Sequence, residues 1–185
     1  ITGASNTFVG NAAGDVNTAS NNVFVGADAG GANTTGTFNT FLGTSAGLLN
    51  VTGTSNTFVG KGAGDANTAS DNTFVGTDAG GANTTGTSNT FLGTSAGLLN
   101  VTGTSNTYVG KGAGDASTAS DNTFVGADAG GANTTGTSNT FLGTSAGLVN
   151  VTGASNTFVG KGAGDASTAS DNTFMGADAG GANST

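Results

Sequence analysis

The chain repeats itself almost completely, and this repetition limits its fold more than any other feature. The block of residues 56–105 returns nearly unchanged as residues 106–155, which gives a period of 50 residues. Within each block, a shorter unit that begins with Asn-Thr-Phe-Val/Leu-Gly recurs at spacings of 16, 17 and 17 residues. Such units are too small to bury a core alone, but stacked neighbours bury a continuous one. We therefore predict that residues 1–185 form a single continuous repeat array.

The unit itself favours strands over helices. Its Thr-Phe-Val-Gly core alternates faces, which places Phe on one side of a strand and Thr with Val on the other. Glycine closes each strand, where the chain turns through a conformation that a Cβ would resist. The 36 glycines of the chain also oppose helices. We expect each unit to contain a pair of short strands joined by corners. The predicted fold class is all-β, a parallel β-solenoid or β-roll whose 16–17-residue coils stack about 4.8 Å apart.

One column of aromatic residues supplies the predicted core. Burial of each ring contributes about 1.5–3 kcal/mol, and contact between rings of adjacent coils adds to this. Stacking of identical residues explains how a chain with few large apolar side chains can fold. This core column comprises Phe8, Phe24, Phe41, Phe58, Phe74, Phe91, Tyr108, Phe124, Phe141, Phe158 and Phe174.

A column of asparagines is predicted to form a ladder, in which stacked amides bond to each other along the axis as in cross-β fibrils. It comprises Asn17, Asn33, Asn50, Asn67, Asn83, Asn100, Asn133 and Asn150, and it is interrupted by Ser117 and Ser167. Many of these asparagines also begin Asn-x-Ser/Thr sequons, which we interpret as incidental to the composition. The sequons begin at Asn33, Asn50, Asn83, Asn100, Asn133, Asn150 and Asn183.

Composition excludes several classes of function. His, Cys and Glu are absent, so the usual catalytic groups are missing and we expect no enzyme. Three Lys against eleven Asp would repel a phosphate backbone, which argues against nucleic acid as a partner. No apolar run approaches the length of a membrane span. Asp65, Asp71 and Asp78 recur in the next block, but the Gly-Gly-x-Gly-x-Asp nonapeptides of calcium-binding β-rolls are missing. We therefore predict neither a metal site nor a cofactor.

The ends of the array lack the atypical capping units that cover the open ends of a free solenoid. The chain opens partway through a unit, because residues 1–5 match residues 51–55, and it stops partway through another at Thr185. We expect a segment of a longer fibre.

The units resemble the head repeats of trimeric autotransporter adhesins and the related shafts of trimeric phage tail fibres. The resemblance rests on residues 71–76, Asp-Asn-Thr-Phe-Val-Gly, and 88–93, Ser-Asn-Thr-Phe-Leu-Gly, which look like the family pattern Asn-Ser-x-Ala-Ile-Gly. It implies a homotrimer of left-handed β-rolls that forms a stiff extracellular stalk or head. The present units are longer, and Phe stands where the family has Ala. In the family geometry, that ring would point towards neighbouring chains.

We therefore expect a structural fibre of a bacterial surface adhesin, filament or phage tail that mediates attachment from a cell surface or virion. Its expected partners are further copies of itself, with host or surface glycans bound through regions outside this segment. The alternative is an ice-binding β-solenoid, because regularly spaced threonines on a flat sheet can order water. That column comprises Thr7, Thr40, Thr57, Thr73, Thr90, Thr107, Thr123, Thr140, Thr157 and Thr173.

Overall fold

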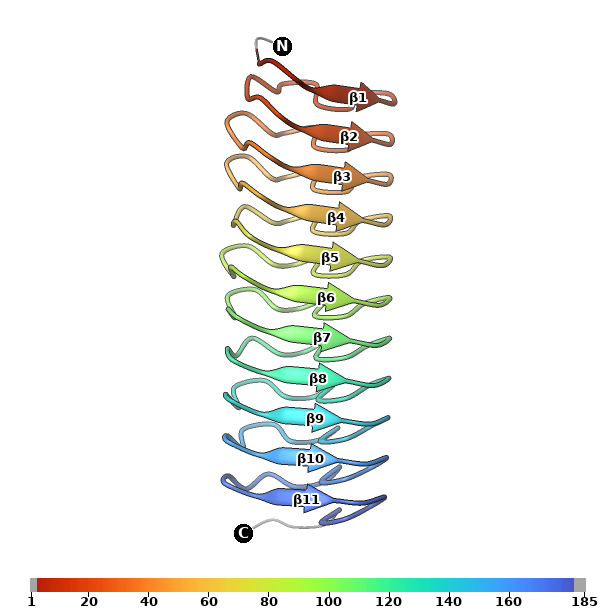
Figure 1. Cartoon of the computed structure of the whole chain (residues 1–185), viewed down its shortest axis with the longest axis vertical. Helices are drawn as coiled ribbons and strands as arrows, with labels where there is room; N and C mark the ends of the chain where they lie inside the picture. The colour runs from red at the N-terminus through yellow and green to blue at the C-terminus, as the bar shows by residue number, and fades with distance from the viewer. Residues whose placement is uncertain (1–2, 182–185) are drawn as a thin grey trace.

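The computed structural model describes residues 3–181 and confirms an all-β, parallel β-solenoid (Figure 1). The coils stack along one axis, and each contributes one three-residue strand to a single eleven-stranded sheet whose strands follow sequence order. The strands are β1 (Thr7–Val9), β2 (Val23–Val25), β3 (Thr40–Leu42), β4 (Thr57–Val59), β5 (Thr73–Val75), β6 (Thr90–Leu92), β7 (Thr107–Val109), β8 (Thr123–Val125), β9 (Thr140–Leu142), β10 (Thr157–Val159) and β11 (Thr173–Met175). None of the described residues belongs to a helix that could cross a membrane.

The strands pair in register, so that like positions of successive units lie side by side. Phe74 of β5 pairs with Phe91 of β6, and Phe91 pairs in turn with Tyr108 of β7. Since the side-chain period of a strand is two residues, this register sends every aromatic ring to the same face of the sheet. The alternation of spacings between 16 and 17 residues is absorbed in the loops, because the strand pairing continues unbroken across both.

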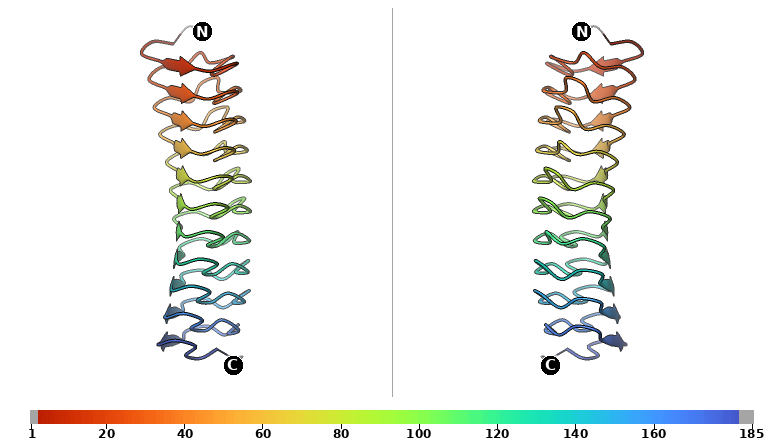
Figure 2. Two further views of the ribbon diagram at one scale, coloured as in Figure 1. Left: turned by 90° about the vertical axis from the view of Figure 1, so that its right-hand side faces the viewer. Right: turned by 90° about the vertical axis from the view of Figure 1, so that its left-hand side faces the viewer.

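The expectation of a second strand in each coil is wrong for residues 3–181, where the wall opposite the sheet consists of turns. The coil that begins with β6 shows the reason, since the φ angles are 142° at Gly93, 56° at Ser95 and 58° at Gly97. A strand needs negative φ values. Coil-to-coil hydrogen bonds persist on this wall nevertheless, such as the one that the Gly97 N–H donates to the Ala113 carbonyl at 2.9 Å. Figure 2 shows the sheet along one edge of the stack and the turns along the other.

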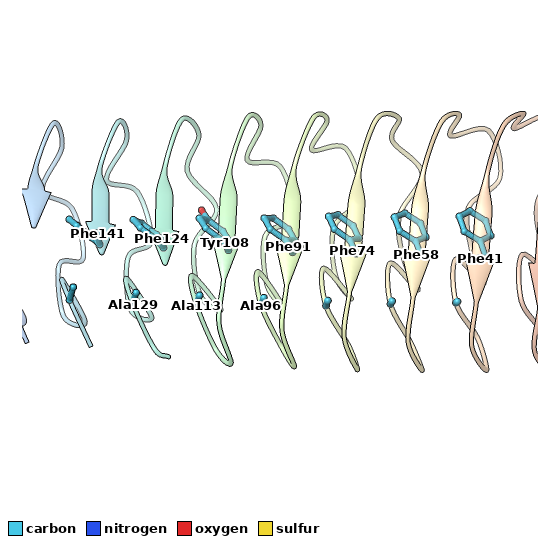
Figure 3. Packing of buried hydrophobic residues seen from close by; sticks show 14 of the residues in the cluster. Phe41, Phe58, Phe74, Phe91, Ala96, Tyr108, Ala113, Phe124, Ala129 and Phe141 are labelled. Carbon is cyan, nitrogen blue, oxygen red and sulfur yellow. The ribbon is translucent and has the colours of Figure 1, made fainter. Parts of the chain in front are cut away.

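The core is a row of rings that faces a row of alanines inside the same chain. Figure 3 shows Phe91 and Tyr108 in the first row, with Ala96 and Ala113 on the facing wall. The rings from Phe24 to Phe158 are fully buried, and the terminal members of the column are partly buried. The structure thus differs from the adhesin geometry, in which a side chain at this position points towards neighbouring chains. A single chain here buries its own rings.

Two glycines in each coil allow this close packing. Gly93 follows β6 with a φ of 142°, and a Cβ there would lie 2.4 Å from the carbonyl oxygen of Gly110. Gly97 lies beneath the ring of Phe91, and a Cβ there would come within 2.5 Å of the ring. Both positions combine a conformation that favours glycine with a contact that excludes any side chain. The Gly at the end of each strand and the Ala-Gly pair therefore set the width of the coil.

Candidate functional site

The asparagine that begins each unit is a hydrogen-bond centre inside the coil. Asn89 is buried, and its carbonyl oxygen accepts a bond of 2.9 Å from the backbone N–H of Asn106 in the next coil. Its amide nitrogen donates a bond of 2.8 Å to the carbonyl of Gly103, which lies three residues before Asn106 in the sequence. Asn72 and Asn106 repeat the bond along the axis with their own successors. We call these residues the first asparagine column, which comprises Asn6, Asn22, Asn39, Asn56, Asn72, Asn89, Asn106, Asn122, Asn139, Asn156 and Asn172.

The predicted asparagine ladder, here the second asparagine column, lies beside the first and is also buried. The amide of Asn50 donates to the carbonyl oxygen of Asn33, and the amide of Asn67 donates to that of Asn50, both at 3.3 Å. The ladder of direct amide bonds runs from Asn17 to Asn83. Beyond this point Asn100 donates only to the Gly103 carbonyl, Asn133 donates to the Gly136 carbonyl and the Ser117 Oγ, and the Asn150 amide nitrogen has no partner.

The breaks at the two serine positions of the ladder have a local cause. Ser117 and Ser167 are shorter than asparagine, so they cannot reach the preceding residue of the column. The side-chain carbonyl oxygens of Asn100 and Asn150, which precede these serines, are buried without a hydrogen-bond partner, as is that of Asn83, which precedes Asn100. Each orphaned polar atom costs about 1–3 kcal/mol. The two serine positions are thus weak points of the second column.

At Ser117, a residue of the aromatic column supplies a hydrogen bond to the serine. Tyr108 replaces Phe in the coil that holds Ser117, and its hydroxyl donates a bond of 2.9 Å to the Ser117 Oγ. Burial raises the pKa of Tyr108 well above its usual value, and the bond to Ser117 lowers it only in part. The hydroxyl therefore stays protonated and remains a donor. Phe158 and Ser167 occupy the same positions one block later, but Phe lacks the hydroxyl and the Ser167 Oγ is orphaned.

Phe158→Tyr is therefore expected to stabilise the protein. The new hydroxyl would reach Ser167 as Tyr108 reaches Ser117, and a satisfied buried hydrogen bond contributes about 1 kcal/mol. Phe58→Tyr is the matched control, because Asn67 fills the corresponding space and the hydroxyl would crowd its amide. Thermal melting of both variants should show a higher Tm for the first and a lower Tm for the second. Equal shifts in both variants would contradict this assignment.

The sequons coincide with the second asparagine column and lie inside the protein. Asn33, Asn50, Asn83, Asn100, Asn133 and Asn150 are fully buried, and Asn183 lies outside the described residues. A buried amide nitrogen that bonds to a backbone carbonyl cannot carry a glycan in the folded chain. The interpretation that these sequons are incidental is consistent with this burial.

The aspartates come closer to each other than their spacing in the sequence suggests. Asp65 and Asp78 belong to adjacent coils, and burial together with the Asp78 carboxylate raises the pKa of Asp65. Burial and Asp128 likewise raise the pKa of Asp115, although the N–H of Ala116 opposes this. Within residues 3–181, no three His, Cys, Asp or Glu side chains lie close enough to hold a metal ion.

The outer face of the sheet carries the remaining ordered array. Each strand directs its first and third residues outward, while the central aromatic points inward. The first residue is Thr in every strand except β2, where it is Val23. The third is Val, Leu or, in β11, Met175. We call these two parallel columns the strand face.

The interior groups bond and pack against their counterparts in adjacent coils. Aromatic, amide and hydroxyl groups hold the coils together, and the described part of the chain contains no cavity that could enclose a small molecule. Comparison with protein-family models, with curated proteins and with solved structures gave no match. A function for this chain has to be inferred from its ladders and its surface.

Proposed function

We propose that this chain is a shaft segment of an extracellular attachment fibre, of the kind found in bacterial surface adhesins or phage tails, and that it has no enzymatic role. One observation carries the proposal. Consecutive rings of the core column stack at centroid distances of 4.8–5.0 Å without interruption from Phe8 to Phe174. A continuous core of identical layers is what a spacer of adjustable length requires.

The hydrogen bonds support a mechanical role because most of them connect one coil to the next along the axis. The strand β6 is hydrogen-bonded to β5 on one side and to β7 on the other. The turns on the opposite wall also form backbone hydrogen bonds from each coil to the next. Bending the rod would stretch these bonds and the ring contacts together. A polar surface with a net charge of −8 would limit sideways association between rods.

Self-association belongs to the same proposal. Since a single chain buries its own rings, a homotrimer or filament would form through outer surfaces or chain ends and not through the aromatic column. Repeated identical surfaces also suit weak multivalent attachment. Glycan recognition is assigned to regions outside this segment.

Small-angle X-ray scattering tests the rod and its assembly in one experiment. Deletion of residues 56–105 removes one whole block and should shorten the rod by roughly 14 Å, given the strand spacing, with the fold retained. Deletion of residues 56–80 is the control, because it joins mismatched positions of the unit and should disrupt the stack. Forward scattering gives the mass, and three times the chain mass of 17.3 kDa would support a homotrimer. Unfolding after the whole-block deletion would overturn the proposed shaft.

A further inference from the structure

The strand face is an uncharged surface of regular pattern. None of the eleven strands contains a charged residue, and the charged side chains all lie in the loops. Lys61, two residues after the end of β4, and Asp71, two residues before the start of β5, border the face without belonging to it. Thr57, Thr73 and Thr90 are exposed in three successive coils, next to the column of Val and Leu. Hydroxyl and methyl groups therefore alternate across a face that runs the length of the stack.

The hydroxyls of this face are free to bind water. Within residues 3–181, the strand threonines donate no side-chain hydrogen bond to the protein, so each keeps one donor and two acceptor positions. Other threonines are occupied, since Thr68 Oγ1 donates to the carbonyl of Thr84 at 2.8 Å and Thr118 Oγ1 donates to that of Thr134 at 2.9 Å. The exposed Val and Leu side chains restrict the orientation of the water next to them.

The spacing of the face is close to that of crystalline water. Hydrogen bonds of about 2.8 Å that meet at the tetrahedral angle of about 109° place next-nearest oxygens of ice about 4.6 Å apart. The coils repeat at 4.8–4.9 Å around β5 and β6, as the stacked rings show. A row of threonine hydroxyls can therefore replace a row of ice oxygens over several coils with a small mismatch.

The rings of adjacent coils lie nearly parallel to one another. Adjacent strands of ordinary sheets are rotated by roughly 20–25°, and such a twist would carry the threonines out of one plane within a few coils. Here the planes of successive rings differ by only 5–8° between Phe58 and Tyr108. Rings this close to parallel keep neighbouring threonines near one plane over a few coils, while Figure 2 shows that the strands turn gradually along the whole stack.

We propose that the strand face binds the surface of ice. Its free hydroxyls match a row of ice oxygens, its methyl groups order the water between them, and its lack of charge suits an uncharged crystal surface. This second function is independent of the proposed attachment fibre, because it requires the exposed sheet and not the assembly.

Ice-recrystallisation inhibition by the intact chain is the first test, with ice itself as the probe. Thr90→Lys places a long charged side chain in the centre of the face and should reduce the inhibition several-fold. Thr85→Lys is the matched control, because Thr85 is also exposed but belongs to a turn. It should retain the activity of the unchanged chain. Circular dichroism melting should show that both variants remain folded.

Each other outcome counts against the proposal. Absence of ice activity in the folded, intact chain overturns it, and so does an equal loss in both variants. A second copy of the chain that covers the strand face would also overturn it, and hydrogen exchange together with solution mass would detect this. The scattering experiment on the block deletion is unaffected by these results, so failure of ice binding is distinguishable from failure of the shaft.

Discussion

Phe91→Asp should unfold the coils on both sides of β6. The Phe91 ring is fully buried, and it stacks at 4.8 Å on Phe74 and at 4.8 Å on Tyr108. Loss of a buried ring costs about 3–5 kcal/mol, and an unpaired carboxylate in the same place adds several kcal/mol. The combined cost approaches the total stability of a typical domain, about 5–15 kcal/mol. Since each coil is supported only by its neighbours, a defect at the centre divides the array.

Thermal melting followed by circular dichroism measures this effect, and hydrogen exchange locates it. Thr90→Asp is the matched control, because it introduces the same charge one residue earlier on the exposed side of β6. The control should melt close to the unchanged protein, since exposed substitutions usually alter stability by less than about 0.5 kcal/mol. A Phe91→Asp protein that melts like its control would show that the ring column does not form the core.

The sheet could be predicted from the sequence because its determinants are local. Thr90, Phe91 and Leu92 alternate outward and inward, and a constant unit fixes which strands become neighbours. The opposite wall could not be predicted in this way. Whether Gly-Thr-Ser-Ala-Gly continues as a strand or turns depends on the φ angle of Ser95, which is positive in the structure, and the turn brings Gly97 against the ring of Phe91. Packing, and not the propensity of those residues, decides the conformation.

The residues of the first asparagine column mark where each unit begins, but the sequence does not show what they bond to. The role of this column stayed hidden because its partners are distant along the chain, as Gly103 is from Asn89. One signal was nevertheless present. Asparagine occupies this position in every unit, whereas the second column accepts serine at Ser117 and Ser167. The position without exceptions is the one whose side chain bonds to two backbone groups just before the next strand.

Asn89→Leu should therefore cost more than a change in the second column. Leucine has a similar size but neither donor nor acceptor, so the backbone N–H of Asn106 would be buried without a partner. An orphaned backbone group of this kind and the lost donation to Gly103 together cost roughly 3 kcal/mol. The Gly103 carbonyl itself keeps one donor, because the amide of Asn100 also bonds to it.

Asn100→Ser is the matched control, because it changes a residue of the second asparagine column in the same coil. The side-chain carbonyl oxygen of Asn100 has no partner, and its amide shares the Gly103 carbonyl with Asn89. Loss of that shared bond should lower the free energy of unfolding by only about 1 kcal/mol. Denaturant unfolding of both variants measures the difference directly. If Asn100→Ser lowered the free energy of unfolding as much as Asn89→Leu, the first column would contribute no more to the stability of the stack than the second. The larger loss at Asn89 would assign the greater contribution to the residue that begins each unit.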